Sequence, residues 1–575
     1  MGRLSSRRSK LIAVLIILAV VILALCYYNA DVRMEFSAEP GFYDDTLNLQ
    51  IYGGRLGSIH YTLDGSKPTL DSELYTDGIE LTDATELPNR ASMRTDTTVG
   101  FDIDFIKSFD DSLENPYAVP DYNVDKIYLV RAVYFDFLGY ERSEITGSYY
   151  LNFDEKPAYE DMAIVSITTD EANLWDSETG IYTTGVYYEN YKNAVLSGED
   201  TVDEQLTWKT WDANYRQEGM DWERPCAVEV FDEQHNRILS QACGLRIQGK
   251  GSTGENQKGL SIFAREEYSG QETFDADLTE SGYKQHRYIL TSGGQDQYVK
   301  INDYLIQNAV KDMNVATMDY RPCMLFLNGE FWGMYYITEP YNAEYVAAHY
   351  DVSADNVIIY KNKNIQEGTE EDNIAYQEMY DFMTTADMSD PDNFAYACEI
   401  VDIYSLIDYY VIMHYIGRIG DWPDSNEAAW RVRDPDYSNE YSDGKWRWML
   451  FDLNGPDWEL DVTRVDDTAD NIMSAMWLRL IVNEEFKNVY AQRYWKLAKE
   501  NFNPDIMDEA IDNYVDKYQA ALELSNKRFF GDEYTDTIIN RTENELKYFF
   551  LRRRDVTPLL VSQICGAQYN DLFGE

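Results

Sequence analysis

The chain is organised around two acidic stretches, Asp421-Trp-Pro-Asp-Ser-Asn426-Glu-Ala-Ala-Trp430-Arg431 and Lys445-Trp-Arg-Trp-Met-Leu-Phe-Asp452-Leu-Asn454-Gly455. The first follows an apolar helical run, and the second is an aromatic and apolar strand that ends in an Asp. Residues 434–444 between them are polar and turn-forming, so the chain is expected to reverse there. This pattern predicts that Asp421, Asn426 and Asp452 come together.

Oxygen ligands from two separate segments suit a hard cation such as Mg²⁺. Phosphate oxygens often complete the coordination shell of this ion. An Asp followed five residues later by Asn, and then an Asp that leaves a strand, is also the layout of the catalytic and metal-binding segments of protein kinases. Ile419 and Gly420 replace the usual His and Arg, and Leu-Asn follows Asp452 in place of Phe-Gly. An acidic turn followed by a buried strand with a capping Asp is the structural alternative.

The composition is that of a large and strongly acidic globular chain. Its 575 residues are 44% hydrophobic, which is enough for more than one packed core. The 49 basic residues are outnumbered by 102 acidic ones, and a net charge of −53 repels phosphate backbones and argues against nucleic acid as a partner. Such an excess of acid is typical of a protein that stays soluble outside a cell, although acidic loops that collect divalent cations are an alternative.

The N-terminus has the pattern of a signal anchor. Residues 1–10 are basic, and residues 11–28 carry no charge. We therefore expect a cytoplasmic segment at 1–10 and a transmembrane anchor at 11–28, which place the bulk of the chain outside the cell as a single-pass protein of the cell membrane. A cleaved signal peptide is the alternative, but the end of the run, Leu-Ala-Leu-Cys-Tyr-Tyr28, lacks a small-residue cleavage pattern.

Residues 35–152 have the alternation of half-buried strands and predict a small antiparallel β-sandwich, with roughly 85–125 as a polar excursion. The stretch Ile59-His-Tyr-Thr-Leu-Asp-Gly-Ser-Lys-Pro-Thr69 resembles the immunoglobulin-like module at the C-terminal end of chitobiases and hexosaminidases. That resemblance implies a spacer, and carbohydrate binding is the alternative.

Residues 160–570 read first as strands and then as helices, so the expected fold class is α+β with two lobes. The strand-rich part contains the glycine-rich connection 249–258, whose backbone amides are able to approach phosphates while Lys258 neutralises them. A flexible hairpin with a solvated lysine is the alternative. An Asn328-Gly329 turn predicts a hairpin, and the chain turns largely helical beyond Pro340. Ile511, Tyr514, Val515, Tyr518 and Leu522 follow the spacing of one buried helical face.

Six ordered motifs together resemble the CotH family of spore-coat-type atypical protein kinases, over roughly residues 160–560. They are Met220-Asp-Trp-Glu-Arg-Pro225, Arg246-Ile-Gln-Gly-Lys-Gly-Ser-Thr with Gln257-Lys258, Ser292-Gly-Gly-Gln-Asp296, Leu327-Asn-Gly-Glu-Phe-Trp-Gly333, Asp421-Trp-Pro with Asn426 and Trp430-Arg431, and Trp446-Arg-Trp-Met-Leu-Phe-Asp452. The resemblance implies that ATP and Mg²⁺ or Mn²⁺ are used to phosphorylate Ser or Thr on secreted or cell-surface proteins.

The resemblance also implies a role for each matching residue. Lys258 would hold the nucleotide phosphates in catalysis, and Asp421 would be the catalytic base. Asn426 and Asp452 would hold the metal. The phosphates would be covered by Gly249, Gly251 and Ser252, and the backbone from Ile337 to Pro340, which includes Glu339, would face the adenine.

Four positions depart from the family pattern: Thr291 for Arg, Gly259 for Ser, Ser425 for Asn, and Asn454 for Asp. The loss of a carboxylate at Asn454 weakens a two-metal site. Two alternatives to a protein kinase therefore stay open: a catalytically inactive surface adhesion or assembly protein whose sandwich holds glycan, and an enzyme that transfers another group from ATP, such as AMP.

Overall fold

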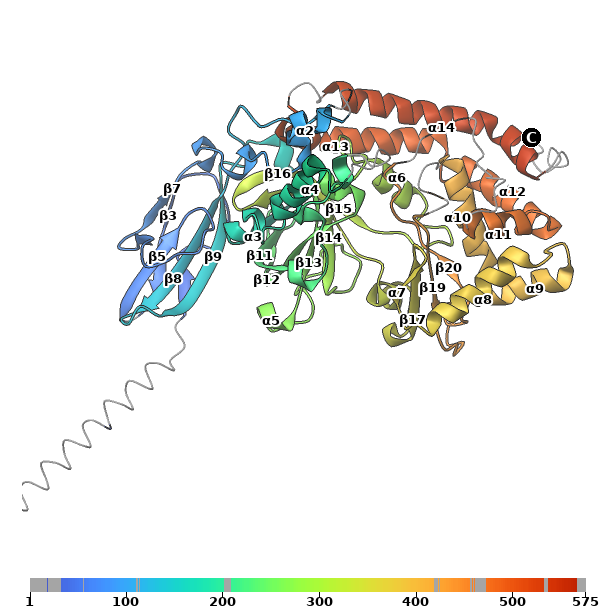
Figure 1. Ribbon diagram of the computed structural model, residues 1–575, viewed down its shortest axis with the longest axis horizontal. Coiled ribbons are helices and arrows are strands. Elements are labelled where there is room, and N and C mark those ends of the chain that lie inside the picture. Colours follow the sequence, from blue (N-terminus) through green and yellow to red (C-terminus); the bar gives the residue numbers. More distant parts are fainter. Residues whose placement is uncertain are drawn as a thin grey trace, which may run out of the picture. The chain divides into compact units, whose positions relative to one another are not determined.

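The computed structural model describes residues 33–54, 56–109, 112, 114–200, 208–417, 422, 425–455, 458, 460, 472–531 and 536–565, together with Leu18. The described chain divides into two compact units, one formed by residues up to 84 and 127–151 and the other by residues 85–126 and those from 152 onward (Figure 1). Among the described residues, no helix is both long and apolar enough to span a bilayer. The anchor predicted at 11–28 lies outside the described residues, except for Leu18.

The first unit is a β-sandwich. A five-stranded sheet has the order β2-β9-β8-β5-β6, and two short sheets pair β1 with β4 and β3 with β7. Buried side chains such as Leu49, Val130 and Tyr149 form its core. The predicted antiparallel arrangement holds with one exception, because β2 pairs in parallel with β9. These two strands lie about a hundred residues apart, so the chain has the length that a parallel crossover needs. The strands are Met34–Phe36 (β1), Gly41–Tyr43 (β2), Leu47–Leu49 (β3), Ile51–Gly53 (β4), Gly57–Thr62 (β5), Glu73–Leu74 (β6), Ile79–Leu81 (β7), Tyr128–Asp136 (β8) and Glu141–Leu151 (β9).

Residues 85–125 were expected as a polar excursion of the sandwich, but residues 85–126 belong to the second unit. They contain short helices at Ala91–Met93 (η2), Val99–Phe101 (η3) and Ile103–Lys107 (α2). The physical reason is burial, since Val99, Phe105 and Ile106 join the hydrophobic core of the second unit.

The second unit begins with a closed barrel of seven strands in the order β10-β11-β12-β13-β14-β16-β15. All neighbours are antiparallel except β10 and β15. Its interior is apolar, with side chains such as Val228, Leu245, Ile262 and Leu290. The strands are Ala163–Thr168 (β10), Arg224–Phe231 (β11), Arg237–Gln248 (β12), Gly259–Phe263 (β13), Arg287–Thr291 (β14), Tyr320–Leu327 (β15) and Glu330–Thr338 (β16).

Short helices and turns lie in the connections between the strands of this barrel. The hairpin predicted at Asn328-Gly329 is confirmed, since it joins β15 to β16 with both residues at positive φ, as this turn requires. The glycine-rich connection joins β12 to β13. The helices are Glu171–Trp175 (α3), Gly185–Ser197 (α4), Glu266–Ser269 (α5) and Asn302–Ala309 (α6).

A second, mainly helical lobe follows the barrel. It is built around a four-stranded sheet with the order β18-β17-β19-β20. Asp390, Asp402 and Asn503 start α9, α10 and α13, because each side chain accepts a hydrogen bond from a free N–H of the first turn. The elements are Ala343–Tyr350 (α7), Val357–Lys361 (β17), Asn364–Glu367 (β18), Asp372–Thr385 (α8), Pro391–Ile400 (α9), Ile403–Tyr415 (α10), Ala428–Val432 (β19), Arg447–Trp448 (β20), Ile472–Leu480 (α11), Glu484–Lys499 (α12), Pro504–Phe530 (α13) and Asp536–Cys565 (α14).

The long helices α13 and α14 pack along each other and connect the two lobes of this unit (Figure 1). The helical face predicted from Ile511 to Leu522 is confirmed, since all five of its residues are buried. On the barrel side, the hydroxyls of Tyr514 and Tyr336 are hydrogen-bonded at 2.6 Å, and the Ser525 hydroxyl accepts the N–H of Met334 at 3.1 Å. The helix thereby holds the barrel strand β16 against the helical lobe.

Candidate active site

Asp452 and Asn426 lie on neighbouring segments of the helical lobe. β19 pairs with β20 so that Ala429 faces Trp448, and the N–H of Met449 donates to the Ala428 carbonyl at 3.0 Å. The two strands run antiparallel, and the segments that carry Asn426 and Asp452 both adjoin the end of β17, since the N–H of Asn362 donates to the Glu427 carbonyl at 3.0 Å and Nζ of Lys361 lies 3.9 Å from the centre of the Phe451 ring. The polar segment 434–444 therefore reverses the chain as its composition predicts.

The backbone around these two residues is strained. Asn362, Lys363, Asn426 and Asp452 all have positive φ, between 49° and 65°. The N–H of Asn426 donates to Oδ1 of Asn362 at 2.8 Å, which ties two of these residues together. Asn and Asp tolerate this conformation better than other residues, and clusters of such residues are typical of functional sites.

The donor set around Asp452 is suited to a metal held in part by a phosphate. Asp452 is half-buried, and its Oδ1 accepts a hydrogen bond from Nδ2 of Asn454 at 2.9 Å. The carboxamide of Asn426 is buried, and its Nδ2 has no hydrogen-bond partner among the described residues. Mg²⁺ commonly takes one or two protein oxygens and fills its shell with substrate phosphates and water. Over the described part of the chain, no three His, Cys, Asp or Glu side chains are grouped to hold a metal by themselves.

A further carboxylate, Asp303 at the start of α6, approaches Asp452 from the barrel side. Burial raises the pKa of Asp303 to about 6, a hydrogen bond from Tyr320 opposes the rise, and the charge of Asp452 adds to it. Nε2 of Gln307 donates both to Oδ1 of Asp303 at 3.1 Å and to the Leu450 carbonyl at 2.9 Å. Helix α6 is thus fastened to the strand that delivers Asp452. Asp303 carries no distinctive signal in the sequence, because an acid in the first turn of a helix is common.

The glycine-rich connection is shaped by two of its glycines. Gly249 has φ 119°, and a Cβ there would meet the Ser252 hydroxyl at 2.4 Å. A Cβ on Gly254 would meet the Lys209 carbonyl at 2.2 Å. Gly251, by contrast, has open space around its Cα, so a ligand has room to approach its backbone.

Comparison with known families agrees with this architecture. Residues 245–557, more than half of the chain, match the family model described as CotH kinase protein. The chain belongs to the CotH kinase family. Residues 50–146 match the model described as Fn3 associated, which does not single out a chitobiase module. A search of curated proteins found no match.

Lys258, which the CotH resemblance places at the nucleotide phosphates, has its side chain bound to protein partners. It is fully buried, and its Nζ donates to the carbonyls of Thr253 and Glu255, both at 2.6 Å. It also lies 3.7 Å from the centre of the Tyr215 ring. Burial lowers the pKa of Lys258 well below its ordinary value. Lys258 therefore supports the glycine-rich connection from inside the barrel, and its expected role at the nucleotide phosphates stays a prediction.

The side chain of Glu339, another expected member of the CotH nucleotide site, is committed to protein partners. It is fully buried, it accepts a hydrogen bond from the Tyr283 hydroxyl, and its Oε1 lies 3.1 Å from Nε2 of His349. The backbone of Ile337 is paired with both Leu290 and Arg321 in the barrel. An adenine would have to use the main chain at Glu339 and Pro340, and that role stays a prediction.

The catalytic base expected for a CotH kinase, Asp421, lies outside the described residues. Its neighbour Trp422 is buried, with its ring near those of Tyr409 and His414. The role of Asp421 therefore stays a prediction.

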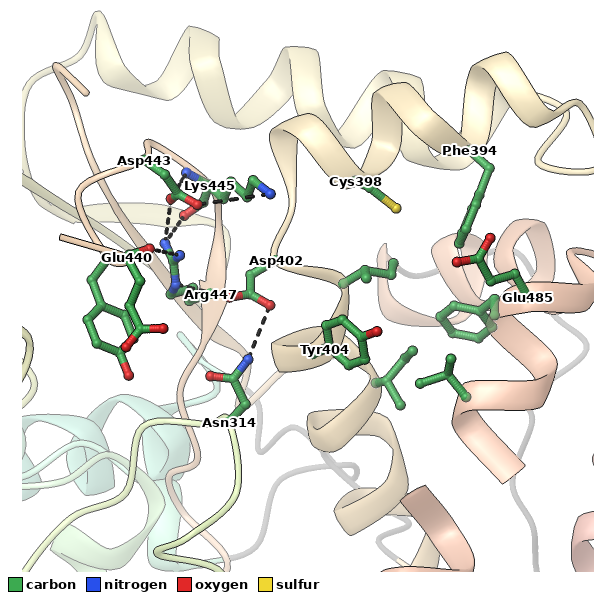
Figure 2. Close-up of a pocket in the computed structure, with 15 residues that line it drawn as sticks. Asn314, Phe394, Cys398, Asp402, Tyr404, Glu440, Asp443, Lys445, Arg447 and Glu485 are labelled. Atoms are coloured by element: carbon green, nitrogen blue, oxygen red, sulfur yellow. Dashed lines mark hydrogen bonds and ion pairs between the residues drawn. The ribbon is translucent and has the colours of Figure 1, made fainter. Parts of the chain in front are cut away.

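A cavity of about 480 Å³ lies in the helical lobe (Figure 2). Its walls come from α9, α10, α12 and residues 440–447. Its charged side chains are mostly paired, since Asn314 donates to Asp402 at 3.1 Å and Arg447 donates to Asp443 at 2.9 Å. None of the residues expected to bind nucleotide or metal lines this cavity, so we do not place the chemistry there.

Proposed function

We propose that this protein is an ATP- and divalent-metal-dependent kinase of the CotH family that phosphorylates Ser or Thr on secreted or cell-surface proteins. The observation that supports the proposal is that Asn426, just before β19, and Asp452, just after β20, both have positive φ and adjoin the same end of β17 within the CotH domain. Their direct approach to each other stays a prediction, which the antiparallel register of β19 and β20 favours.

In this proposal Asp452 and Asn426 hold Mg²⁺ or Mn²⁺, which neutralises charge on the β- and γ-phosphates. The substrate hydroxyl oxygen forms a bond to the γ-phosphorus as the bond from that phosphorus to the bridging oxygen breaks, and ADP leaves. Asp421 takes the hydroxyl proton. Asp303 and Gln307 position Asp452, because they fasten α6 to the segment that delivers it.

We also propose that the protein acts outside the cytoplasm, held in the cell membrane by residues 11–28. The support is the basic segment before the uncharged run and the large excess of acidic residues. The Fn3-associated sandwich serves as a spacer between the anchor and the kinase unit in this proposal. A chitobiase-like role in binding surface glycan is the finer alternative for the sandwich.

A second function, as a catalytically inactive assembly protein, is favoured by two observations. The expected phosphate lysine, Lys258, is buried in the barrel, and Asn454 stands where the family often has an Asp. Incubating the full-length protein with γ-labelled ATP and, separately, with α-labelled ATP in Mg²⁺ or Mn²⁺ separates the possibilities. We expect label to be incorporated from the γ-position. Label from the α-position would indicate AMP transfer, and no label from either would favour the inactive protein.

A further inference from the structure

The outward face of the barrel strands β12, β13 and β14 carries a row of polar and cationic side chains. The pairing sets Arg246 opposite Ser261, and Phe263 opposite Arg287. The alternate residues Leu245, Ile262 and Leu290 belong to the barrel core. Since side chains alternate between the two faces of a strand, Arg246, Ser261 and Arg287 lie on the face turned away from that core.

Arg287 has only neutral partners on this face. Its Nη2 donates to Oε1 of Gln248 at 2.6 Å and to the Ser261 hydroxyl at 3.1 Å. Among the described residues, no carboxylate lies within ion-pair distance of Arg287, and no acceptor is hydrogen-bonded to its Nη1. Burial, together with the smaller effect of the Arg246 charge, lowers the pKa of Arg287 to about 10. A largely desolvated guanidinium without a counter-charge is costly, unless an anion completes the site.

Lys361, the last residue of β17, reaches the same region from the helical lobe. Its Nζ lies 3.9 Å from the centre of the Phe451 ring, next to Asp452 in sequence. Burial lowers the pKa of Lys361 to about 8. The Asp452 charge opposes this shift, and the charges of Arg287 and Lys250 add to it. The charges of Arg287 and Lys250 thus both act on Lys361, in a chain where acidic residues outnumber basic ones by two to one.

The order of elements along the chain explains why these cations meet. Lys250 belongs to the glycine-rich connection between β12 and β13, Arg287 begins the next strand, and α6 follows that strand. In ordinary protein kinases, the phosphate-binding lysine is on the third strand, after the glycine-rich loop and the strand that leaves it. β14 takes that place in this barrel, whereas Lys258 directly precedes the strand that leaves the loop.

We infer that Arg287 and Lys361, together with Lys250, form a polyphosphate-binding site that spans the two lobes and takes the role expected of Lys258. Its ligand is the triphosphate chain of the nucleotide, so the inference rests on the proposed function. Arg287 offers its Nη1 amino group to a phosphate oxygen from the barrel side. Lys361 offers an ammonium from the opposite lobe, beside the metal ligand Asp452, and Lys250 covers the chain from the glycine-rich connection.

The test is calorimetric titration of the full-length protein with inorganic tripolyphosphate, with ATP and with adenosine. We expect Arg287→Met and Lys361→Met each to weaken binding of tripolyphosphate and ATP by about tenfold or more, the loss typical of one charged contact, and to leave adenosine binding unchanged. Lys311→Met is the matched control, because this exposed lysine of the same unit pairs with Asp319 at 2.5 Å, and it should bind all three ligands as the wild type does.

Two conservative variants keep the test independent of folding defects. Arg287→Lys and Lys361→Arg retain the charge and should recover most of the tripolyphosphate affinity lost in the methionine variants. The inference is overturned if the wild type does not bind tripolyphosphate, or if the methionine variants bind it as tightly as the wild type. Failure of the proposed function looks different: tripolyphosphate binding would depend on Arg287 and Lys361, but no label would be transferred from ATP.

Discussion

Asn454 donates a hydrogen bond through Nδ2 to Oδ1 of Asp452 at 2.9 Å. The neutral carboxamide of Asn454 is thus hydrogen-bonded to one of the two carboxylate oxygens of the expected metal ligand. The CotH pattern often has a second carboxylate at position 454. The Asn454 side chain lies close to the Gly293-Gly294 turn, since a Cβ on Gly294 would meet its Nδ2 at 2.6 Å.

The variant Asn454→Asp should therefore bind Mg²⁺ or Mn²⁺ more tightly than the wild type does. Without metal, two carboxylates would face each other and the melting temperature should fall. With saturating metal, the melting temperature should recover to the wild-type value or above it. Calorimetric metal titration and thermal unfolding with and without Mn²⁺ measure both effects. Unchanged metal affinity would show that residue 454 only caps the turn.

Replacing the expected metal ligand and the expected base should have different effects. Asp452→Asn should abolish metal-dependent ATP binding and phosphate transfer together, because the metal loses its only described carboxylate ligand. Asp421→Asn should keep ATP binding nearly intact and lower the turnover by about 10²- to 10⁴-fold, the usual contribution of a general base. Binding calorimetry and initial rates on the same preparations separate the two. Equal loss of binding in both variants would contradict the assigned roles.

Lys258 should affect stability more than nucleotide binding. In Lys258→Ala, the carbonyls of Thr253 and Glu255 lose their donor and a cavity opens under Tyr215, so the free energy of unfolding should fall by about 2–4 kcal/mol. Lys258→Met fills most of that space and should lose less. Denaturant unfolding measures this order. ATP affinity of the folded Lys258→Met protein should stay close to that of the wild type, and a loss as large as that of Lys361→Met would restore Lys258 as a phosphate ligand.

An ion pair near the start of α8 should make stability depend on acid pH. Two nitrogens of Arg433 donate to the two oxygens of Asp372 at 2.8 Å, and this hydrogen bonding lowers the pKa of Asp372 to about 2. Because the folded pKa lies below the ordinary value of 3.8, the pair stabilises the fold fully above pH 4, and its contribution is lost as the pH falls toward 2. Asp372→Asn should lower the free energy of unfolding by about 1 kcal/mol at pH 7, since Arg433 is partly exposed, and by nearly nothing at pH 2. Urea unfolding at both pH values measures the difference.

Local sequence patterns predicted much of the architecture. Alternation located the strands of both units, and helical spacing located the buried face of α13. A turn-rich segment implied a chain reversal, which the antiparallel pairing of β19 and β20 confirms, whereas the meeting of Asn426 and Asp452 stays a prediction. Lys258 was expected at the nucleotide phosphates because it follows a glycine-rich connection, whereas the structure buries its side chain. The signal that places it correctly is its even spacing with Leu260 and Ile262, which lie on the inner face of β13.

Residues that act through long-range contacts could not be predicted in the same way. Arg287, Lys361 and Asp303 are single charged residues in ordinary strands and helices, and only long-range packing brings Asp303 and Lys361 near Asp452 and Arg287 near Lys361. The packing of residues 85–126 against the second unit could not be predicted either, because the segment is mostly polar and only a few of its apolar side chains join that distant core.

That excursion makes direct contact with the glycine-rich connection. The hydroxyl of Thr98 donates to the Gly254 carbonyl at 2.6 Å, and the hydroxyl of Thr97 donates to Oδ1 of Asn256 at 2.7 Å. The chain passes between the sandwich and the kinase unit three times, near residues 84, 126 and 151. Replacing everything before residue 152 would remove Thr97 and Thr98 and leave this loop without both contacts, so a foreign sandwich has to be inserted as two separate pieces around a retained segment 85–126.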